Sequence, residues 1–371
     1  MKRSLFIVTF ALIAQLSFYA AAAQADPSTG IVVDRQGRVY FADERRNVVW
    51  KIETDGKLVQ FITGKHAHKI ALDEQGNLYG EHLAYRGDDR WEFHLWKATP
   101  DGELSYVIPP SPGFPPGLLM DKEGNRYQWG GSGNIKKTSS LIQKLTPDSK
   151  LVTIAGSGWG WADGKGDEAL FGSVGGMAWG NDSALYVTDS GAVRRVTLDG
   201  DVKTIARGGH PLEPALSWGV FGGMGGHLFG LTLDEESNIY VANTGGGLVA
   251  KVTPDGKVGA LVKSESGWAP TGVAIADKEL YILEHGPFGL RVRKLSAGGK
   301  LTTLATVEAA DQGGAFGAAI RTAERAGLDA DKVIVGSMVA GVIVVAIIVA
   351  VFFWRIRRFI RDFQRKRTGA A

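Results

Sequence analysis

The sequence predicts an all-β fold, a six-bladed β-propeller of four-stranded antiparallel blades, followed by one C-terminal transmembrane helix. Three observations predict the propeller. One phrase, in which two apolar runs flank a polar turn and the second run contains a Tyr, occurs six times. Each copy continues into a third apolar run, a tight turn and a fourth run. The copies start 40 to 58 residues apart, which is close to the spacing of propeller blades.

The four strands of each blade follow from these runs. The repeated phrase, which holds the first two strands, starts at residues 30, 70, 117, 175, 230 and 272. The third strands are expected at residues 48–52, 94–98, 141–145, 192–196, 248–252 and 290–295. The turn that follows is Asp-Gly in most copies, and Asp-Gly between apolar runs is a strong hairpin signal. Such units stack because none can bury its apolar face alone, so we place the propeller at residues 26–307.

Residues 154–202 resemble an NHL repeat. They contain a Gly-rich lead-in, the sequence ADG at residues 162–164, YVTDS at residues 186–190 and a closing DG. Residues 230–258 are similar, and the other four copies resemble the wider group of six-bladed propellers that includes gluconolactonase-like enzymes. The resemblance implies the fold. It leaves the function open, because this fold carries binding modules, scaffolds, lactonases and lyases.

Both ends of the chain predict export and membrane anchoring. Residues 1–25 begin with two basic residues, continue through an uncharged apolar run and end in small residues, which is the pattern of a cleaved signal peptide. Residues 308–332, rich in Ala and Gly, are expected to be a spacer. Residues 333–354 are uncharged and would measure roughly 33 Å as a helix, enough to span a bilayer. The basic tail at residues 355–371 then predicts a cytoplasmic C-terminus and a propeller outside the cytoplasm.

The C-terminal segments also suggest partners. The tail places Arg side chains around an apolar helical stripe, which suits contact with an anionic inner leaflet, although a plain stop-transfer flank is an equal alternative. Small residues four apart in the span, Gly336 with Ala340 and Ser337 with Gly341, would permit a weak dimer. Removal of the span after export is a third possibility.

Composition excludes several functions. The chain has a net charge of +3, but residues 26–332 hold 33 of the 42 basic residues and 38 of the 39 acidic ones. The basic isoelectric point therefore reflects the tail, and nucleic acid is not an expected partner. The sequence contains no Cys, which excludes thiol nucleophiles, thiolate zinc sites and disulfides. An exported domain without disulfides must rely on its hydrophobic core.

One face of the propeller is the predicted ligand site. The connections between blades and the loops between second and third strands lie on the same face of a propeller, which we name the upper face. The tight turns lie on the opposite, lower face. Aromatic and titratable residues concentrate at upper-face positions, as expected of a ligand site. The candidate ligand-binding residues are Arg45, Glu81, His82, Trp159, Trp161, Trp218, Asn243, Trp268, Glu284 and His285.

Some upper-face residues have a structural alternative. The residue three positions after the repeated Tyr is Asp43, Asp189 or Asn243 in three of the blades. Asp is ordinary at this position in NHL repeats, where its side chain can accept hydrogen bonds from the next turn, so we favour a structural role for these three. His82 and Glu284 depart from that pattern and are better functional candidates.

A metal site is a further candidate on this face. The candidate ligands are His66, His68, His210 and His227. The first two would lie on one side of an extended segment, and a third His would leave an open position, as catalytic zinc requires. Gluconolactonase-like enzymes instead hold a divalent cation with Glu, Asn and Asp, for which Asn243 and Glu284 are approximate counterparts. One divalent ion, zinc or calcium, is therefore a possible cofactor. The alternative is that these His residues are ordinary polar loop residues.

Two functions remain open at this point. The first is a membrane-anchored binding module that presents its upper face to a protein, peptide or small-molecule ligand, with Trp159 and Trp161 either stacking on that ligand or packing against a neighbouring blade. The second is a metal-dependent hydrolase or lyase that uses His and carboxylate residues of the same face. We favour the binding module, because no complete catalytic constellation is visible in the sequence.

Overall fold

The computed structural model describes residues 28–88, 90–113, 115, 117–130, 141–207, 228–286 and 289–308. The predicted signal peptide, transmembrane helix and basic tail lie outside these residues, as does the spacer beyond its first residue. Trp218, His210 and His227 also lie outside them. Within the described ranges, no helix is long and apolar enough to span a membrane.

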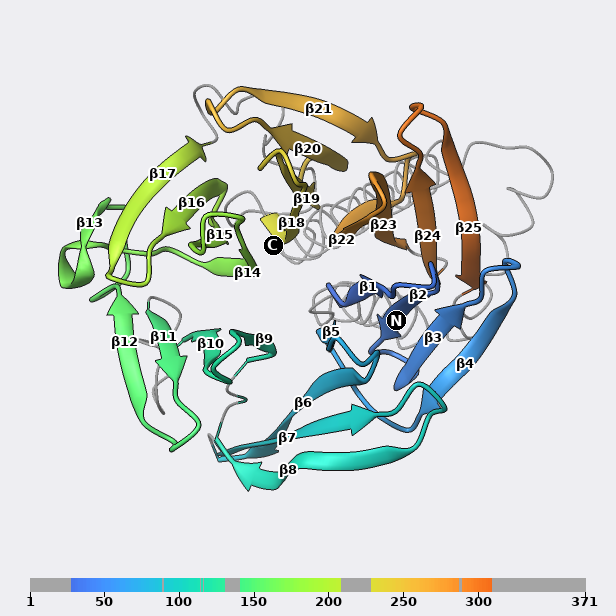
Figure 1. Cartoon of the computed structure of the whole chain (residues 1–371), viewed down its shortest axis with the longest axis horizontal. Coiled ribbons are helices and arrows are strands. Elements are labelled where there is room, and N and C mark those ends of the chain that lie inside the picture. The colour runs from blue at the N-terminus through green and yellow to red at the C-terminus, as the bar shows by residue number, and fades with distance from the viewer. Residues whose placement is uncertain are drawn as a thin grey trace, which may run out of the picture. The chain divides into compact units, whose positions relative to one another are not determined.

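Six antiparallel sheets surround a central axis, each with its first strand innermost and its fourth strand near the rim (Figure 1). Blade 1 consists of β1 (Ile31–Val33), β2 (Val39–Asp43), β3 (Val48–Ile52) and β4 (Leu58–Thr63). Blade 2 consists of β5 (Ile70–Leu72), β6 (Leu78–Gly87), β7 (Arg90–Ala98) and β8 (Leu104–Pro112). Blade 3 consists of β9 (Leu119–Met120), β10 (Arg126–Trp129), β11 (Ile142–Leu145) and β12 (Leu151–Ala155).

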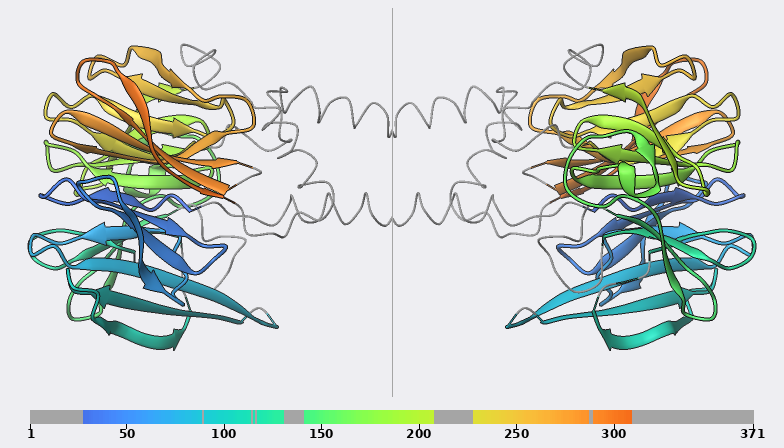
Figure 2. Two further views of the ribbon diagram at one scale, coloured as in Figure 1. Left: turned by 90° about the vertical axis from the view of Figure 1, so that its right-hand side faces the viewer. Right: turned by 90° about the vertical axis from the view of Figure 1, so that its left-hand side faces the viewer.

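The second half of the ring continues in the same direction. Blade 4 consists of β13 (Gly164–Lys165), the short 3-10 helix η1 (Gly166–Glu168), β14 (Val174–Trp179), β15 (Leu185–Asp189), β16 (Ala192–Val196) and β17 (Asp201–Arg207). Blade 5 consists of β18 (Leu228–Leu233), β19 (Ile239–Asn243), β20 (Leu248–Val252) and β21 (Val258–Lys263). Blade 6 consists of β22 (Ala269–Ala276), β23 (Glu279–Gly286), β24 (Gly289–Leu295) and β25 (Leu301–Glu308). The side views show how strongly the sheets twist (Figure 2).

The predicted six-bladed propeller is confirmed, with one difference in blade 4. This sheet has a fifth strand, because β13 pairs with the rim strand β17. The added strand comes from the Gly-rich connection between blades 3 and 4, which runs out to the rim before it enters the first strand. A connection that makes its own strand is fixed along its length, and this one carries Trp159 and Trp161.

Hydrophobic clusters join successive blades. Five clusters of buried residues each combine side chains from two neighbouring blades: blades 1 and 2, 3 and 4, 4 and 5, 5 and 6, and 6 and 1. In the cluster between blades 6 and 1, Phe41 packs with Leu283 and Val292, and all three are fully buried. The core is therefore a ring of shared interfaces, as expected for units that cannot bury both faces alone.

The ring closes without exchange of a strand between the first and last blades. The Thr271 hydroxyl of blade 6 donates a hydrogen bond to the Ser28 carbonyl at 2.8 Å. On the other side, the backbone N–H of Thr29 donates to the His68 carbonyl at 2.9 Å. The segment that precedes β1 thus bridges blades 6 and 2, and backbone and hydroxyl groups close the ring.

The recurring Tyr anchors the turn between the first and second strands. In blade 2, Asp73 Oδ1 accepts hydrogen bonds from the backbone N–H groups of Gln75 at 3.0 Å and Asn77 at 2.8 Å, and Asp73 Oδ2 accepts one from the Tyr79 hydroxyl at 3.0 Å. The same carboxylate-to-phenol bond occurs in blades 1, 3 and 5, as Tyr40 with Asp34, Tyr127 with Asp121, and Tyr240 with Asp234. The Asp side chain fixes the turn, and the Tyr ties it to the second strand.

Glycine in the first strands permits a close approach of neighbouring blades. A Cβ atom on Gly272 would overlap the Thr29 carbonyl oxygen, and one on Gly175 would overlap the Leu228 carbonyl oxygen. Each overlapping atom belongs to the backbone of the next blade and cannot rotate away. These positions therefore require Gly for steric reasons, which explains why the repeated phrase so often begins with it.

The substitution Gly272→Ala is expected to destabilise the protein by about 1–3 kcal/mol, because the new methyl group forces blades 6 and 1 apart. Gly259→Ala is the matched control, since its Cβ would meet no atom within 4 Å. Urea unfolding of both variants measures the difference. Equal unfolding midpoints for the two variants would contradict the role given to this close approach.

Candidate functional site

The upper face is held together by bonds between the two kinds of loop predicted to meet there. The backbone N–H of Gly172, in the connection before β14, donates to Asp189 Oδ1 at 2.8 Å. The Ser264 hydroxyl, in the connection before β22, donates to Glu284 Oε1 at 2.5 Å. Connections between blades and second-to-third-strand loops therefore share this face, and the upper-face positions are spatial neighbours.

A buried arginine holds the connection between blades 3 and 4. The Arg194 side chain is 2 % exposed and forms an ion pair with the fully buried Asp189 at 3.0 Å. Its guanidinium also donates to the carbonyl oxygens of Leu170 at 2.6 Å and Ala162 at 2.5 Å, and to Asp163 Oδ1 at 2.9 Å. One side chain thus binds both arms of the Gly-rich connection. Several donors engaged in a low-dielectric setting make a stiff attachment.

The connection that Arg194 holds presents two exposed indoles. Trp159 is 67 % exposed and Trp161 is 46 % exposed. Their ring centroids lie 4.7 Å apart with the planes at 65°, so the two rings form a corner. Trp161 lies so close to Gly172 that a Cβ there would approach its Nε1 to 2.6 Å, and the Arg207 guanidinium lies 5.6 Å from its ring centroid. Two roles were predicted for these residues, packing against a neighbouring blade and stacking on a ligand. Packing would leave less of each indole in solvent, so the observed exposure favours stacking on a ligand.

The residues three positions after the repeated Tyr are bound within the protein. Asp43 Oδ2 accepts hydrogen bonds from Arg46 at 2.7 Å and from the Trp50 indole at 3.2 Å. Asn243 Oδ1 accepts one from the backbone N–H of Gly246 at 2.9 Å. With Asp189 held by Arg194, all three residues make the local contacts that a structural role requires.

Glu284 lies at the centre of a buried ion cluster. Its carboxylate is fully buried and contacts Arg291 Nε at 2.5 Å and Arg293 at 3.4 Å, in addition to the Ser264 hydroxyl. Arg291 is a direct cross-strand partner of Glu284. The Arg291 guanidinium also lies 4.4 Å from the ring centroid of Trp268, another candidate residue. Glu284 is thus surrounded by positive charge, and any role it has in binding a ligand remains a prediction.

Four histidines form a contiguous group at the upper edge of blades 1 and 2, which we name the histidine cluster: His66, His68, His82 and His94. The Nε2 atoms of His66 and His68 lie 2.8 Å apart. The ring of His66 contacts that of His82 edge to face at 5.3 Å, and His82 stacks on His94 at 4.4 Å. Burial, reinforced by the neighbouring His94 and His66, lowers the pKa of His82 to about 4. Burial also lowers the pKa of His94.

A carboxyl group and an imidazole both bond to Ser28 at the ring closure. Glu44 Oε2 accepts a hydrogen bond from the backbone N–H of Ser28 at 3.3 Å, and His285 is hydrogen-bonded to the Ser28 backbone. Burial raises the pKa of Glu44 to about 6. Burial, with a smaller contribution from the charge of Arg45, lowers the pKa of His285 to about 3. Two buried titratable groups with shifted pKa values thus share one backbone partner.

The remaining candidate residue, Glu81, is nearly buried between blades 2 and 3. Its Oε1 lies 3.7 Å from the Lys69 ammonium, which sits 3.3 Å from the ring centroid of Trp129 in the next blade. The ammonium therefore links a carboxylate of one blade to an aromatic ring of another. This contact joins two blades at the upper face.

The predicted metal ligands are brought together in part. His66 and His68 are adjacent, while His210 and His227 lie outside the described residues. Among the residues that the structure describes, no three His, Asp or Glu side chains are already arranged around a common point suitable for a metal ion. Zinc or calcium as cofactor therefore remains a prediction.

Sequence reasoning missed the third-strand partners Arg194, Arg291 and His94. Each lies in the strand that pairs with the one carrying a predicted residue, and the pairing sets Glu284 opposite Arg291 and His82 opposite His94. The sequence does contain a signal that could have identified these residues. Charged or His residues inside otherwise apolar third strands mark positions that need a polar partner.

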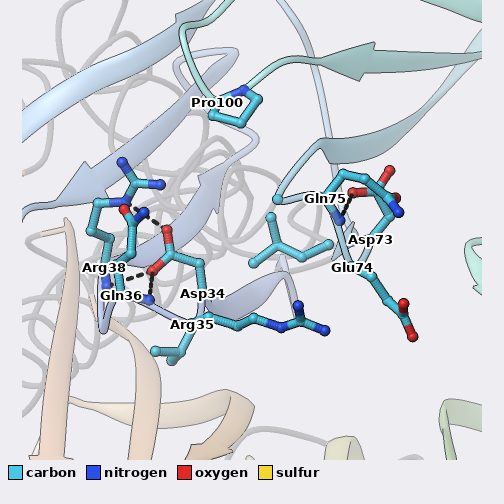
Figure 3. A pocket seen from close by; sticks show the side chains of 11 residues that line it. Asp34, Arg35, Gln36, Arg38, Asp73, Glu74, Gln75 and Pro100 are labelled. Atoms are coloured by element: carbon cyan, nitrogen blue, oxygen red, sulfur yellow. Dashed lines mark hydrogen bonds and ion pairs between the residues drawn. The ribbon is translucent and has the colours of Figure 1, made fainter.

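A pocket of about 440 Å³ lies on the lower face, between the first-to-second-strand turns of blades 1 and 2 (Figure 3). Two of the carboxylates that line it bind their own turns: Asp34 accepts from the backbone N–H groups of Gln36 and Arg38, and Asp73 from that of Gln75. This pocket is on the face opposite the predicted site.

Comparison with known proteins finds only distant structural similarity. No protein-family model matches the chain, and no curated protein is significantly similar. Among solved structures, virginiamycin B lyase from Staphylococcus aureus is 16 % identical with a TM-score of 0.45, covering 76 % of this chain and 85 % of its own. A gluconolactonase from Xanthomonas campestris is 15 % identical with a TM-score of 0.48, covering 75 % and 87 %. A luciferin-regenerating enzyme is 17 % identical with a TM-score of 0.44, covering 76 % and 94 %. At these identities and TM-scores the similarities carry no activity over to this chain, and the fold rests on the sheet topology described above.

The pKa of His285 predicts a pH dependence of stability. Since the folded pKa of about 3 lies below the unfolded value of about 6.5, the unfolded state binds the proton more tightly, and stability is lost as the pH falls from about 6.5 toward 3. The loss between pH 7.5 and pH 5 should be on the order of 2 kcal/mol. His285→Gln should remove that part of the profile. Urea unfolding of both proteins at the two pH values tests this, and parallel profiles would contradict it.

Proposed function

We propose that the protein is a membrane-anchored ligand-binding module outside the cytoplasm, and that Trp159 and Trp161 form the contact surface for its ligand. The observation that carries the proposal is the exposed indole corner on a connection fixed by the buried Arg194. A large aromatic side chain left in water loses the stabilisation that burial would provide. Two of them, held side by side by a rigid support, are best explained by a partner that covers them.

The attachment of this connection favours binding for an energetic reason. Ordering a loop upon association costs roughly 0.5–1.5 kcal/mol for each immobilised side chain. Here the order is already provided by the bonds of Arg194 and by the pairing of β13 with β17. A preorganised site avoids most of that cost, and aromatic residues dominate the energy of such sites.

The shape of the corner favours a carbohydrate ring. Two indoles at 65° offer one ring face for stacking and a second ring at the side. A sugar ring presents an apolar face of C–H groups to the first and hydroxyl groups around its edge. Arg207, beside Trp161, provides a donor for those hydroxyl groups.

The location of the module rests on the sequence. The signal peptide at residues 1–25, the uncharged stretch at residues 333–354 and the Arg-rich residues after it support export of the propeller and anchoring by its C-terminus. An anchored propeller stays at the membrane surface while its upper face binds. The basic tail supports contact with anionic lipids of the inner leaflet.

A hydrolase or lyase is the second candidate, and Glu44 with His285 favours it. Both side chains bond to Ser28, and a pKa near 6 leaves Glu44 mostly ionised at neutral pH, where its carboxylate can act as a general base while His285 stays neutral. If this pair is catalytic, Glu44→Gln should reduce turnover of a lactone or ester substrate by at least about 100-fold. Screening such substrates with the wild-type protein and this variant distinguishes the two functions. Absence of turnover by the wild-type protein would exclude the second.

Loss of either indole is expected to weaken carbohydrate binding at least about tenfold, which corresponds to about 1.4 kcal/mol. The measurement is titration of the protein with a panel of soluble oligosaccharides, followed by calorimetry, for Trp159→Ala and Trp161→Ala. Leu198→Ala is the control, because Leu198 is 45 % exposed in a lower-face turn. The carbohydrate proposal is wrong if no oligosaccharide binds. It is also wrong if the variant that carries both Trp159→Ala and Trp161→Ala binds as tightly as the wild type.

A further inference from the structure

We infer that the histidine cluster, His66, His68, His82 and His94, forms a binding site for a divalent transition-metal ion of the kind that prefers imidazole ligands. This site is separate from the indole corner. It differs from the ligand set predicted from the sequence, because His82 and His94 replace His210 and His227.

The first observation is the arrangement of the backbone. His66 and His68 alternate along the connection that precedes β5, which places their side chains on one side. His82 and His94 are direct cross-strand partners on β6 and β7. Side chains of such partners leave Cβ atoms about 4.5–5.5 Å apart, a separation from which two imidazoles can reach one ion. Two pairs of His from two chain segments therefore face each other.

The second observation is a buried imidazole with no partner. His94 is 9 % exposed, and neither of its ring nitrogens has a hydrogen-bond partner. His82 Nδ1 is also buried without one. A buried polar atom left unsatisfied costs roughly 1–3 kcal/mol, so three such atoms in adjacent rings require an explanation. Coordination of a metal ion by these rings would remove much of that cost.

The third observation is the contact between the four rings. The ring centroid of His66 lies 4.5 Å from that of His68 and 5.3 Å from that of His82, and His82 stacks on His94 at 4.4 Å. The four imidazoles therefore bring several ring nitrogens into one small volume.

In the described structure the ring nitrogens of the cluster do not converge on one point. Rotation of the side chains would bring them into coordination geometry. The Nε2 atoms of His66 and His68 are 2.8 Å apart, whereas two ligands of a tetrahedral zinc ion are about 3.3 Å apart. The pair must open by about half an ångström, and the ring of His82, at 5.3 Å from His66, must turn toward it. A half-turn of an imidazole about its Cβ–Cγ bond exchanges the positions of carbon and nitrogen, so each ring can present a nitrogen on either side.

The charged neighbours of the cluster are already paired. Arg86 binds Glu92 at 2.6 Å, and the Lys65 ammonium contacts the Tyr106 hydroxyl at 3.1 Å. Both cations oppose a bound metal ion, and Glu92 offsets part of that repulsion. A ligand set made of imidazole, without a thiolate, suits zinc, copper or nickel and disfavours calcium and magnesium.

Such an ion would fasten the connection between blades 1 and 2 to the extended ends of β6 and β7. It would therefore stabilise the folded state by an amount that grows with the logarithm of the free metal concentration once that exceeds the Kd. Because this effect needs no substrate, it can be measured on the whole protein whether or not the proposed ligand binding is correct.

The test uses the full-length protein, stripped with a chelator and titrated with zinc against a chromogenic competitor. One zinc ion per chain is expected, with a rise in the unfolding temperature. His82→Gln and the double substitution His66→Ala with His68→Ala should each weaken binding at least about 100-fold, since loss of a hydrogen-bond partner outside the ligand shell alone costs 10–100-fold. His285→Gln is the matched control and should bind zinc as the wild type does.

Two results would overturn the inference. The first is binding of less than one zinc ion per chain at saturation. The second is unchanged zinc affinity in the double variant and in His82→Gln, because the ion would then bind to other residues. Should the double variant fail to fold, two further measurements decide. Cobalt bound to wild-type protein must give the absorption of a tetrahedral nitrogen site, and that absorption must change in His82→Gln.

Discussion

Blade-to-blade burial is the interaction on which the rest of this structure depends. Each sheet has two apolar faces, and the five clusters described above bury them against the neighbouring blades. The interaction acts at short range, so the innermost strands must come close together. Gly175 and Gly272 permit this approach, because any side chain there would meet the backbone of the next blade. Each blade thus supports its neighbours around the ring.

This construction leaves the upper face free to vary. The paired strands give each loop a fixed starting point, and the loops differ in length: β6 and β7 pair out to Gly87 and Arg90, whereas β2 and β3 end their pairing at Asp43 and Val48. Buried ion pairs then fix those loops: Arg194 binds the connection before blade 4, and Arg291 binds Glu284 in blade 6. Removing one partner from such a pair would leave a buried charge uncompensated, so these residues maintain loop geometry more than they add net stability. The indole corner and the histidine cluster both rest on this frame.

The sequence was sufficient for the architecture for a clear physical reason. The turn chemistry of Asp73 with Tyr79, repeated in other blades, is local, and local patterns can be recognised in a linear chain. The number of blades, the positions of the second strands and the Asp-Gly turns were all predicted from such local patterns. The additional strand β13 could not be predicted, because two residues carry no periodicity and their pairing with β17 depends on where the connection runs.

The site was predicted less completely because its contacts are not local. The upper-face assignment brought the right loops together, but the role of each side chain depends on its cross-strand partner. Glu284 was a functional candidate without a known partner, and the register places Arg291 opposite it. His82 was a candidate of the same kind, and the pairing of β6 with β7 places His94 beside it. A register shift of one residue would reverse both assignments, and only the folded sheet fixes the register.

The central claim is that the indole corner is covered by a ligand where the protein works. Hydroxyl-radical footprinting of intact cells that make the protein, compared with the purified protein, tests this directly. The account predicts that oxidation of Trp159 and Trp161, measured relative to the exposed lower-face Leu198, falls in cells. An identical ratio in cells and in the purified protein would mean that nothing covers the corner and would contradict the claim.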